Sequence, residues 1–341
     1  MSRHLDIKYQ ALFLVVVIIG SVYTMRFLQF AAGAGKSATS TQSSASVLAS
    51  AEIAPLDSFS RGKIIGDATH APAAPPVNTS VGDSVRGNPS LQSLDVTMCP
   101  SVSARFYRVQ DLSSGQVLLA RNPQQRWPIA SITKLVTAIV ATRVLNPDTI
   151  IAITPDIEAQ VGDDHTLAVG QQYSARDLIT IMLVISSNDA AYALADAYGL
   201  NGFVAHMNDT ARTAGMDQTT FYEPSGLSYL NQSTLQEISS LLIYMYRAYP
   251  SLLSITRQKQ YTALDHATGK QHVFSNIDFY AGQSAFIGGK TGYIDTSGGN
   301  LVGLFHYQIG TIIAGVFGSS DRFADMDALL ACANKVAPSQ P

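Results

Sequence analysis

The order of β-type and helical segments predicts an α+β fold, with one antiparallel sheet built from both ends of the ordered part and a helical insertion between them. Short β-type runs lie at 104–109 and 116–121, and two more lie at 299–307 and 310–318. Helical patterns fill the middle, and another closes the chain at 321–336. Strands at both ends with helices between them favour this architecture.

The opening hairpin and the first helix follow from local patterns. The first two β-type runs are separated by Asp-Leu-Ser-Ser-Gly, a cluster of turn-forming residues, which predicts that they pair as a hairpin. After Pro128, apolar residues recur with helical spacing as far as Val140. This pattern predicts a helix that begins near Ser131.

Further helices are predicted along the middle of the chain. Ser174, followed three residues later by Asp177, has the pattern of a capping box for an apolar helix that ends near Ile185. Helical periodicity returns at 202–214 and again at 233–246. The last two β-type runs flank a tight turn, so they predict a closing hairpin.

Composition divides the chain into three parts. Residues 35–97 are rich in Ala, Ser, Gly, Pro and Asn and have no sustained period, which predicts a flexible linker. The linker joins an N-terminal segment, residues 1–34, to a folded domain, residues 98–338. The formal net charge of −3, without any cluster of Lys and Arg, excludes a nucleic-acid partner. We expect a monomer.

An apolar run at residues 11–25 is preceded by Arg3 and Lys8 and closed by Arg26. Two interpretations remain open: a secretory signal cleaved after the small residues 32–34, or an uncleaved membrane anchor. Either one places the rest of the chain outside the cytoplasm, secreted or anchored at the extracytoplasmic face of the cell membrane.

The two cysteines, Cys99 and Cys332, lie just inside the two ends of the predicted domain. In an oxidising compartment they could form a disulfide, and two free buried thiols are the alternative. No His-Glu-x-x-His pair and no Gly-x-Ser-x-Gly elbow occurs, so a zinc peptidase and a Ser-His-Asp hydrolase both lack their usual motifs. We expect neither a metal nor a cofactor.

Ser131 and Lys134 are a candidate nucleophile and base. A separation of three residues places both side chains on one face of a helix, where an amine can take the proton of the hydroxyl. A lysine acts as a base only when its amine is neutral. Because burial and a nearby cation both lower a lysine pKa, a partner lysine is expected. Taken alone, the pair could equally be a helix cap and a solvated lysine.

Two further motifs supply polar groups. Ser186-Ser187-Asn188 interrupts an apolar helical pattern. The interruption is either a plain helix break or a functional site, in which the Ser186 hydroxyl relays a proton and the Asn188 amide binds the substrate. Residues 289–292, Gly-Lys-Thr-Gly, lie before the closing hairpin. Glycines on a strand allow another backbone to approach, and Lys290 and Thr291 offer a charge and a hydroxyl to a carboxylate. A plain turn has the same composition and is the alternative.

The three motifs together carry more information than each alone. Their order, S-x-x-K, S-x-N and K-T-G, is that of class A β-lactamases and penicillin-binding proteins. From about Ala104 to Ala333 the chain resembles the D-alanyl-D-alanine carboxypeptidase family of low-molecular-mass penicillin-binding proteins. The resemblance rests on PIASITKLVTAIV, ISSNDAAYALAD, FYEPSGLS and GGKTGYIDTSGGNLV. A further stretch, YPSLLSITRQ, is similar to one in the D,D-endopeptidase branch.

The resemblance implies the penicillin-binding-protein/β-lactamase-like transpeptidase fold and an acyl-enzyme on Ser131. Lys134 would be the general base, and Ser186 would pass the proton to the leaving amine. The substrate peptide of peptidoglycan would be bound by Asn188, Lys290, Thr291 and Gly292. The backbone N–H groups of Ser131 and Tyr293 would form the oxyanion hole. β-Lactam antibiotics would inhibit by acylating the same serine.

Several alternatives remain open at this point. Cleavage of a terminal D-alanine and cleavage of a cross-link differ only in what flanks the scissile bond, so carboxypeptidase and endopeptidase are not separated. A class A-like β-lactamase needs a deacylating glutamate, and Glu223 is a candidate, although the residues that follow lack the E-x-x-L-N pattern. A catalytically silent wall-binding protein of the same fold is the last alternative.

Overall fold

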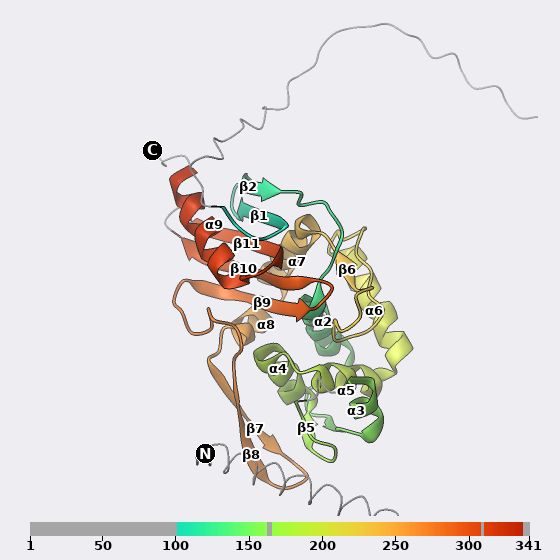
Figure 1. Cartoon of the computed structure of the whole chain (residues 1–341). Helices are drawn as coiled ribbons and strands as arrows, with labels where there is room; N and C mark the ends of the chain where they lie inside the picture. Colours follow the sequence, from blue (N-terminus) through green and yellow to red (C-terminus); the bar gives the residue numbers. More distant parts are fainter. Residues whose placement is uncertain (1–100, 162–165, 308–309, 337–341) are drawn as a thin grey trace, which may run out of the picture. The chain divides into compact units, whose positions relative to one another are not determined.

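A five-stranded antiparallel sheet joins the first and the last strands of the described chain (Figure 1). The computed structural model describes residues 101–161, 166–307 and 310–336. The strand order is β2-β1-β11-β10-β9, so β9 forms one edge of the sheet. The α+β prediction is therefore confirmed. The strands are β1 (Phe106–Asp111), β2 (Val117–Arg121), β9 (Phe286–Ile294), β10 (Gly298–Tyr307) and β11 (Gly310–Ser319).

The sheet is covered on both faces, and its side chains alternate between two apolar cores. Leu304, Ile313 and Phe317 belong to a large core shared with the helical insertion. Leu301 and Ile312 belong to a smaller core. The smaller core lies under the closing helix α9 (Arg322–Val336), which lies in front of the sheet in Figure 1. Successive side chains of a strand point to opposite faces, which explains the division.

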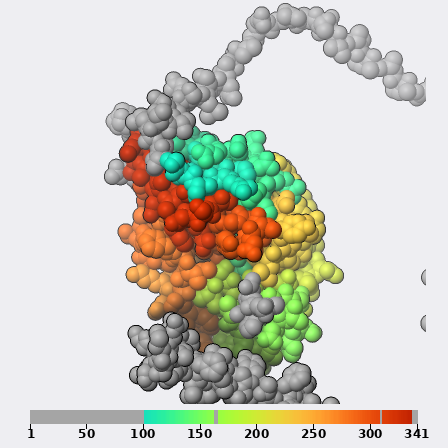
Figure 2. Space-filling model, in the orientation of Figure 1, coloured from blue at the N-terminus to red at the C-terminus, as the bar shows by residue number. Residues whose placement is uncertain are grey.

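The helical insertion lies between β2 and β9. Among its described residues it contains a short 3₁₀ turn, η2 (Ala130–Thr133), and seven α-helices. Their bounds are α2 (Lys134–Val144), α3 (Pro155–Val161), α4 (Ala175–Ile185), α5 (Asn188–Tyr198), α6 (Leu200–Thr213), α7 (Leu235–Ala248) and α8 (Pro250–Thr256). In Figure 2 this part, coloured green to yellow, meets the orange edge of the sheet across one face of the molecule.

Three small two-stranded sheets complete the described chain, and the sequence patterns did not predict them. They are β3 (Trp127–Pro128) with β6 (Gln232–Ser233), β4 (Ile150–Ala152) with β5 (Gln172–Ser174), and β7 (Gln260–Asp265) with β8 (Lys270–Ser275). Strands β3 to β6 have only two or three residues and are too short to show a period, whereas β7 and β8 have six residues each and were missed although they are long enough. The β7–β8 hairpin projects from the body of the molecule in Figure 1.

Both predicted hairpins are present, and the predicted cap of α4 is confirmed. The Ser174 hydroxyl accepts from the Asp177 backbone N–H at 3.1 Å and donates to the Asp177 carboxylate at 2.7 Å. The helix predicted to begin near Ser131 differs in detail, because Ser131 lies in η2 and α2 begins at Lys134. Ala130 has a φ of 50°, and this left-handed residue forces the chain through a tighter turn before α2.

Several predictions fall outside the described residues. They concern the segment 1–34, the linker 35–97 and Cys99. Cys332 is buried on α9, with 1% of its surface exposed, and its pairing with Cys99 stays a prediction. Within the part of the chain that the structure describes, no helix is both long enough and apolar enough to cross a membrane.

Asp325 on α9 ties the start of the domain to its end. Its carboxylate accepts from the Ser103 backbone N–H and hydroxyl at 2.9 and 2.7 Å, from the Ala104 N–H at 2.8 Å and from the Ser319 hydroxyl at 2.5 Å. Burial raises the pKa of Asp325, but these hydrogen bonds outweigh burial, and the pKa lies below its usual value.

Replacing Asp325 with alanine is expected to lower the free energy of unfolding by about 3 kcal/mol, because buried donors lose their acceptor. Exposed Asp196 on α5 is the matched control, and Asp196→Ala is expected to change stability by less than about 0.5 kcal/mol. Urea unfolding at pH 7 measures the free energy of unfolding of both variants. Since the folded pKa of Asp325 is depressed, the stability difference between the wild type and Asp325→Ala should persist at neutral pH and shrink as pH falls through that pKa. Equal losses in both variants would contradict this role of Asp325.

Candidate active site

Ser131 lies in η2, at the junction of the sheet and the helical insertion. The chain reaches it from β3, and α2 follows it immediately. The turn is held by the strand pairing of β3 with β6 and by the Ile129 N–H, which donates to the Asn231 carbonyl at 3.0 Å. The Asn300 side chain on β10 also donates to the Pro128 carbonyl at 2.9 Å. Segments distant in sequence therefore fix the backbone before the serine.

Two glycines pack against the backbone of the Ser131 turn. A Cβ on Gly226 would lie 2.0 Å from the Ala130 carbonyl oxygen, and a Cβ on Gly292 would lie 2.9 Å from the Ser131 nitrogen. Neither distance is possible for a side chain, so only glycine allows these approaches. Gly292, predicted from the Lys-Thr-Gly motif, thus brings the edge strand β9 directly beside the Ser131 N–H.

Lys134 is completely buried, and its amine contacts the Ser131 hydroxyl and two oxygen acceptors. Its Nζ lies 3.0 Å from the Ser131 Oγ, 2.7 Å from the Asn188 Oδ1 and 2.5 Å from the Ser225 carbonyl oxygen. The amide and carbonyl oxygens only accept hydrogen bonds. In a neutral amine, the two N–H bonds can be directed at these acceptors while the lone pair faces the hydroxyl. The predicted pair is therefore in contact, and Asn188 and Ser225 orient the amine.

Ser186 and Lys290 form a second contact pair. Ser186 ends α4 in a left-handed conformation with φ 63°, which presents its hydroxyl between α4 and α5. The Lys290 Nζ on β9 donates to the Ser186 Oγ at 2.9 Å and to the Thr291 carbonyl at 2.9 Å. Such a strained conformation for a residue other than glycine is typical of functional sites. The helix interruption predicted at 186–188 is thus the break between α4 and α5, where Ser186 contacts Lys290 and Asn188 contacts Lys134.

Burial dominates the electrostatics of Lys290, of whose surface only 2% is exposed. Desolvation lowers the pKa of Lys290 to about 7, with a smaller lowering from Arg322 and an opposing effect from Asp278. Burial in turn raises the pKa of Asp278, against the effect of the two cations. The strand therefore holds a lysine that changes charge near neutral pH.

Arg322, at the start of α9, is a site residue that sequence reasoning missed. Besides its effect on Lys290, its own pKa is lowered by burial and raised by Asp278 and Tyr293, which places it among these groups. Its Nε atom is buried and has no hydrogen-bond partner in the described structure. A cationic side chain that acts on Lys290 and has a buried donor atom without a partner suits an anionic ligand. No motif surrounds Arg322 in sequence, so only the fold reveals it.

Glu223 is buried and binds its own loop rather than facing Ser131. Its carboxylate accepts from the backbone N–H groups of Ser225 and Gly226, both at 2.6 Å, and from the Asn231 Nδ2 at 3.0 Å. These bonds fix the Ser225 carbonyl, to which the Lys134 amine donates. Glu223, a candidate deacylating base in the sequence, therefore supports the loop residue Ser225, which in turn contacts Lys134.

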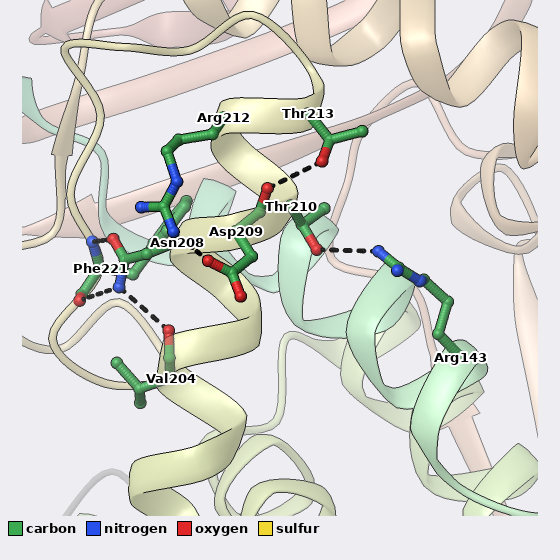
Figure 3. A network of polar contacts seen from close by, with 8 residues as sticks. All are labelled: Arg143, Val204, Asn208, Asp209, Thr210, Arg212, Thr213 and Phe221. Carbon is green, nitrogen blue, oxygen red and sulfur yellow. Dashed lines mark hydrogen bonds and ion pairs between the residues drawn. The ribbon is translucent and has the colours of Figure 1, made fainter.

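Figure 3 shows how α6 holds the start of this loop. The Asn208 side chain donates to the Phe221 carbonyl at 2.9 Å and accepts from the Phe221 N–H at 3.0 Å. On the other side of α6, Thr210 contacts Arg143 of α2 at 3.4 Å. The helix that carries Lys134 and the loop that carries Ser225 are thus linked through α6.

The assembled groups define a class of enzyme. A serine hydroxyl in contact with a buried lysine, a second lysine on the sheet edge, and glycines that admit another backbone are the parts of a serine acyl-transfer site. In the described ranges no cluster of three or more His, Cys, Asp or Glu side chains suits a metal ion.

Comparison with known proteins identifies the family. The family described as D-alanyl-D-alanine carboxypeptidase matches residues 94–321, and the chain belongs to it. A D-alanyl-D-alanine endopeptidase of Pseudomonas aeruginosa is 33% identical over 235 residues, which cover 65% of this chain and 74% of that protein. The protein is thus a serine-type D-Ala-D-Ala peptidase, a hydrolase with a penicillin-binding fold.

Solved structures agree with this assignment. The D-alanyl-D-alanine carboxypeptidase of Mycobacterium tuberculosis H37Rv matches with a TM-score of 0.63 and 26% identity, covering 71% of this chain and 94% of that one. Penicillin-binding protein D2 of Listeria monocytogenes, in its cefotaxime-bound form, matches with a TM-score of 0.60 and 26% identity, covering 69% and 98%.

Proposed function

We propose that this protein cleaves peptidoglycan stem peptides at D-alanine through an acyl-enzyme on Ser131, with release of the terminal D-alanine. The observation that carries the proposal is the contact of the Lys134 Nζ with the Ser131 Oγ at 3.0 Å, with the amine also held by Asn188 and Ser225. A nucleophile with an adjacent oriented base is what covalent catalysis needs.

In the acylation step, the Ser131 oxygen bonds to the carbonyl carbon of the penultimate D-alanine, and Lys134 takes the hydroxyl proton. The C–N bond then breaks, and the leaving amine receives a proton through the Ser186 hydroxyl. The developing oxyanion would accept from the backbone N–H groups of Ser131 and Tyr293, a contribution of about 3 kcal/mol per donor. Water then attacks the ester and regenerates Ser131.

The carboxylate of the substrate would be bound by Lys290, Thr291 and Arg322. Burial, the two cations and the missing partner of the Arg322 Nε support this assignment. The glycine at 292 leaves room for the substrate backbone beside Ser131, and Asn188 would bind its peptide group. β-Lactams, which carry a carboxylate beside a reactive carbonyl, would acylate Ser131 in the same orientation.

Location and assembly are part of the proposal. Peptidoglycan substrates lie outside the cytoplasm, so the domain 98–338 would act there, linked by residues 35–97 to an N-terminal signal or membrane anchor. The domain would act as a monomer. A disulfide between Cys99 and Cys332 would suit that oxidising compartment.

The pH dependence of substrate binding follows from Lys290. Because its pKa is about 7, the ammonium form prevails below pH 7 and the neutral amine above it. The KM for a peptide ending in D-Ala-D-Ala is therefore expected to rise about tenfold between pH 6 and pH 8. Lys290→Arg stays charged over this range and serves as the comparison. A KM that stays constant in the wild type would contradict the assignment of Lys290 to the carboxylate.

Digestion of purified muropeptides tests the reaction itself. Uncross-linked pentapeptides should release free D-alanine, detected by chromatography, and the Ser131→Ala variant should release none. A second candidate reaction is cleavage of cross-links, because the similar protein of Pseudomonas aeruginosa is named an endopeptidase. Release of monomers from cross-linked dimers, without free D-alanine from pentapeptides, would replace the first candidate with the second.

A further inference from the structure

The side chain of Asn300 on β10 joins the sheet to the segment that leads to Ser131. Asn300 is completely buried. Its Nδ2 donates to the Pro128 carbonyl at 2.9 Å, and its Oδ1 accepts from the Gly318 N–H of β11 at 3.1 Å. Pro128 stands three residues before Ser131. One buried amide therefore connects the middle of the sheet with the backbone just before the proposed nucleophile.

A bulge in the sheet gives Asn300 its partner on β11. The register of β10 against β11 shifts at this point, so that Asn300 alone faces two residues of β11, Phe317 and Gly318. A bulge disrupts the hydrogen-bond ladder at the extra residue. Here the N–H of Gly318, a left-handed residue with φ 66°, donates to the Asn300 side chain. This bond fixes the Asn300 Oδ1 and leaves the Nδ2 directed at Pro128.

The backbone of Asn300 holds β9 where that strand lies against the Ser131 turn. Asn300 pairs with Gly292 in the β9–β10 ladder, and its carbonyl accepts from the Thr291 Oγ1 at 3.4 Å. Gly292 is the residue whose Cβ would lie 2.9 Å from the Ser131 nitrogen. Asn300 thus binds β9 through its backbone and the segment before Ser131 through its side chain.

The Tyr293 N–H faces the open edge of β9. The Gly289 N–H donates to the Thr256 Oγ1 of α8 at 3.0 Å, so it points away from β10. Backbone groups alternate in direction along a strand, and the pairing with β10 is regular from Gly289 to Tyr293, so the Tyr293 N–H points the same way. The proposed oxyanion donors, the N–H groups of Ser131 and Tyr293, therefore lie on the two segments that Asn300 joins.

We propose that Asn300 is a positioning residue that sets the spacing between the Ser131 N–H and β9, and with it the geometry of the oxyanion hole. The proposal rests on the proposed function and extends it to a residue that never touches the substrate. Oxyanion donors act only within hydrogen-bond distance of the oxygen that becomes charged, so a small change in this spacing lowers the rate. Acylation and hydrolysis of the acyl-enzyme both pass through such an oxyanion.

Asparagine suits both partners of this side chain. A carbonyl oxygen needs a donor and an N–H needs an acceptor, and a side-chain amide offers one of each. Leucine has a similar size but serves neither partner. Trp127 supplies another contact between β3 and the β9–β10 hairpin, since its Nε1 donates to the Ser297 carbonyl at 2.9 Å. We therefore expect Asn300→Leu to loosen the junction without opening it.

Stopped-flow reaction with a fluorescent penicillin at rising concentrations tests the proposal, because it separates the dissociation constant of the non-covalent complex from the acylation rate. In Asn300→Leu the acylation rate should fall about 10²-fold, and hydrolysis of the acyl-enzyme should slow by a similar factor. The dissociation constant should change by less than about threefold. The fall should be the same at pH 6 and pH 8, since neither hydrogen bond of the Asn300 side chain involves a titratable group.

Asp265→Ala is the matched control. Asp265 on β7 is also buried and also joins two segments, because its carboxylate accepts from the Gln172 N–H at 3.0 Å and from the Thr268 hydroxyl at 2.7 Å. Both Asp265→Ala and Asn300→Leu should unfold at a lower urea concentration than the wild type. Only Asn300→Leu should acylate slowly, and Asp265→Ala should acylate at the wild-type rate.

The outcomes separate the possible roles of Asn300. An acylation rate of Asn300→Leu within about threefold of the wild type would overturn the proposal, and so would slow acylation with unchanged hydrolysis of the acyl-enzyme. Asn300→Ala is a second variant that removes both hydrogen bonds, and loss of folding in both variants would show a purely structural role and likewise overturn it. If the wild type is not acylated at Ser131, the proposed function fails before Asn300 is tested.

Discussion

Replacing Lys134 with alanine is expected to lower the second-order rate of Ser131 acylation by about 10³- to 10⁴-fold, because the serine loses the base that takes its proton. The substitution also leaves the Asn188 amide oxygen and the Ser225 carbonyl without the amine that donates to them. Stopped-flow measurement with a fluorescent penicillin follows the acylation directly, and peptide hydrolysis should fall in parallel.

Two comparisons make this result specific to Lys134. Lys259, between α8 and β7, is exposed, and Lys259→Ala is expected to acylate at the wild-type rate. Lys134→Arg offers N–H donors to the same acceptors but stays protonated and cannot take the serine proton, so it should be as slow as the alanine variant. Fast acylation in Lys134→Arg would mean that Lys134 binds the substrate by its charge and that another group takes the proton.

The second large effect is expected at Glu223. Glu223→Gln places an amide where the carboxylate accepts from the N–H groups of Ser225 and Gly226, so a donor is forced against donors. The loop then no longer fixes the Ser225 carbonyl beside Lys134. We expect acylation to slow by about 10²-fold and the free energy of unfolding to fall by about 2 to 4 kcal/mol.

Glu223 also decides between the peptidase and a β-lactamase-like enzyme. Because the Glu223 carboxylate binds its own loop, the acyl-enzyme of Glu223→Gln is expected to hydrolyse at a rate similar to that of the wild type. Measuring the decay of the penicilloyl-enzyme separates this step from acylation. Fast acylation combined with arrested deacylation would assign Glu223 the role of the deacylating base.

Much of the fold could be predicted from local patterns, since strand and helix periods depend on neighbours in sequence. The two hairpins of the sheet and the capped helix α4 follow in this way. The turn at Ser131 differs, because the left-handed Ala130 is imposed by tertiary contacts: Gly226 lies against its carbonyl, and Asn231 and Asn300 hold the residues before it. Such a turn has no periodic signal.

The contacts among the motif residues could be anticipated because each motif is compact in sequence, while the roles of these residues stay a prediction. The structure brings Ser131, Lys134 and Asn188 into contact, as it does Ser186 and Lys290. The supporting groups were not predictable, because their roles depend on long-range proximity. Arg322 lies on α9 and Asp278 in the loop between β8 and β9, far from Lys290 in sequence, and both affect its pKa. The group of Ser225 that contacts Lys134 is a backbone carbonyl, which every residue type has, so the sequence does not mark it.

The role of Ser131 as the acylated nucleophile is the centre of the proposed mechanism. The most direct measurement is mass spectrometry of the intact protein and its peptides after a short incubation with benzylpenicillin. We expect one adduct of the mass of the antibiotic, located on the peptide containing Ser131 and missing from Ser131→Ala. An adduct on another serine, or none in a folded wild-type protein that binds the antibiotic, would contradict this role of Ser131.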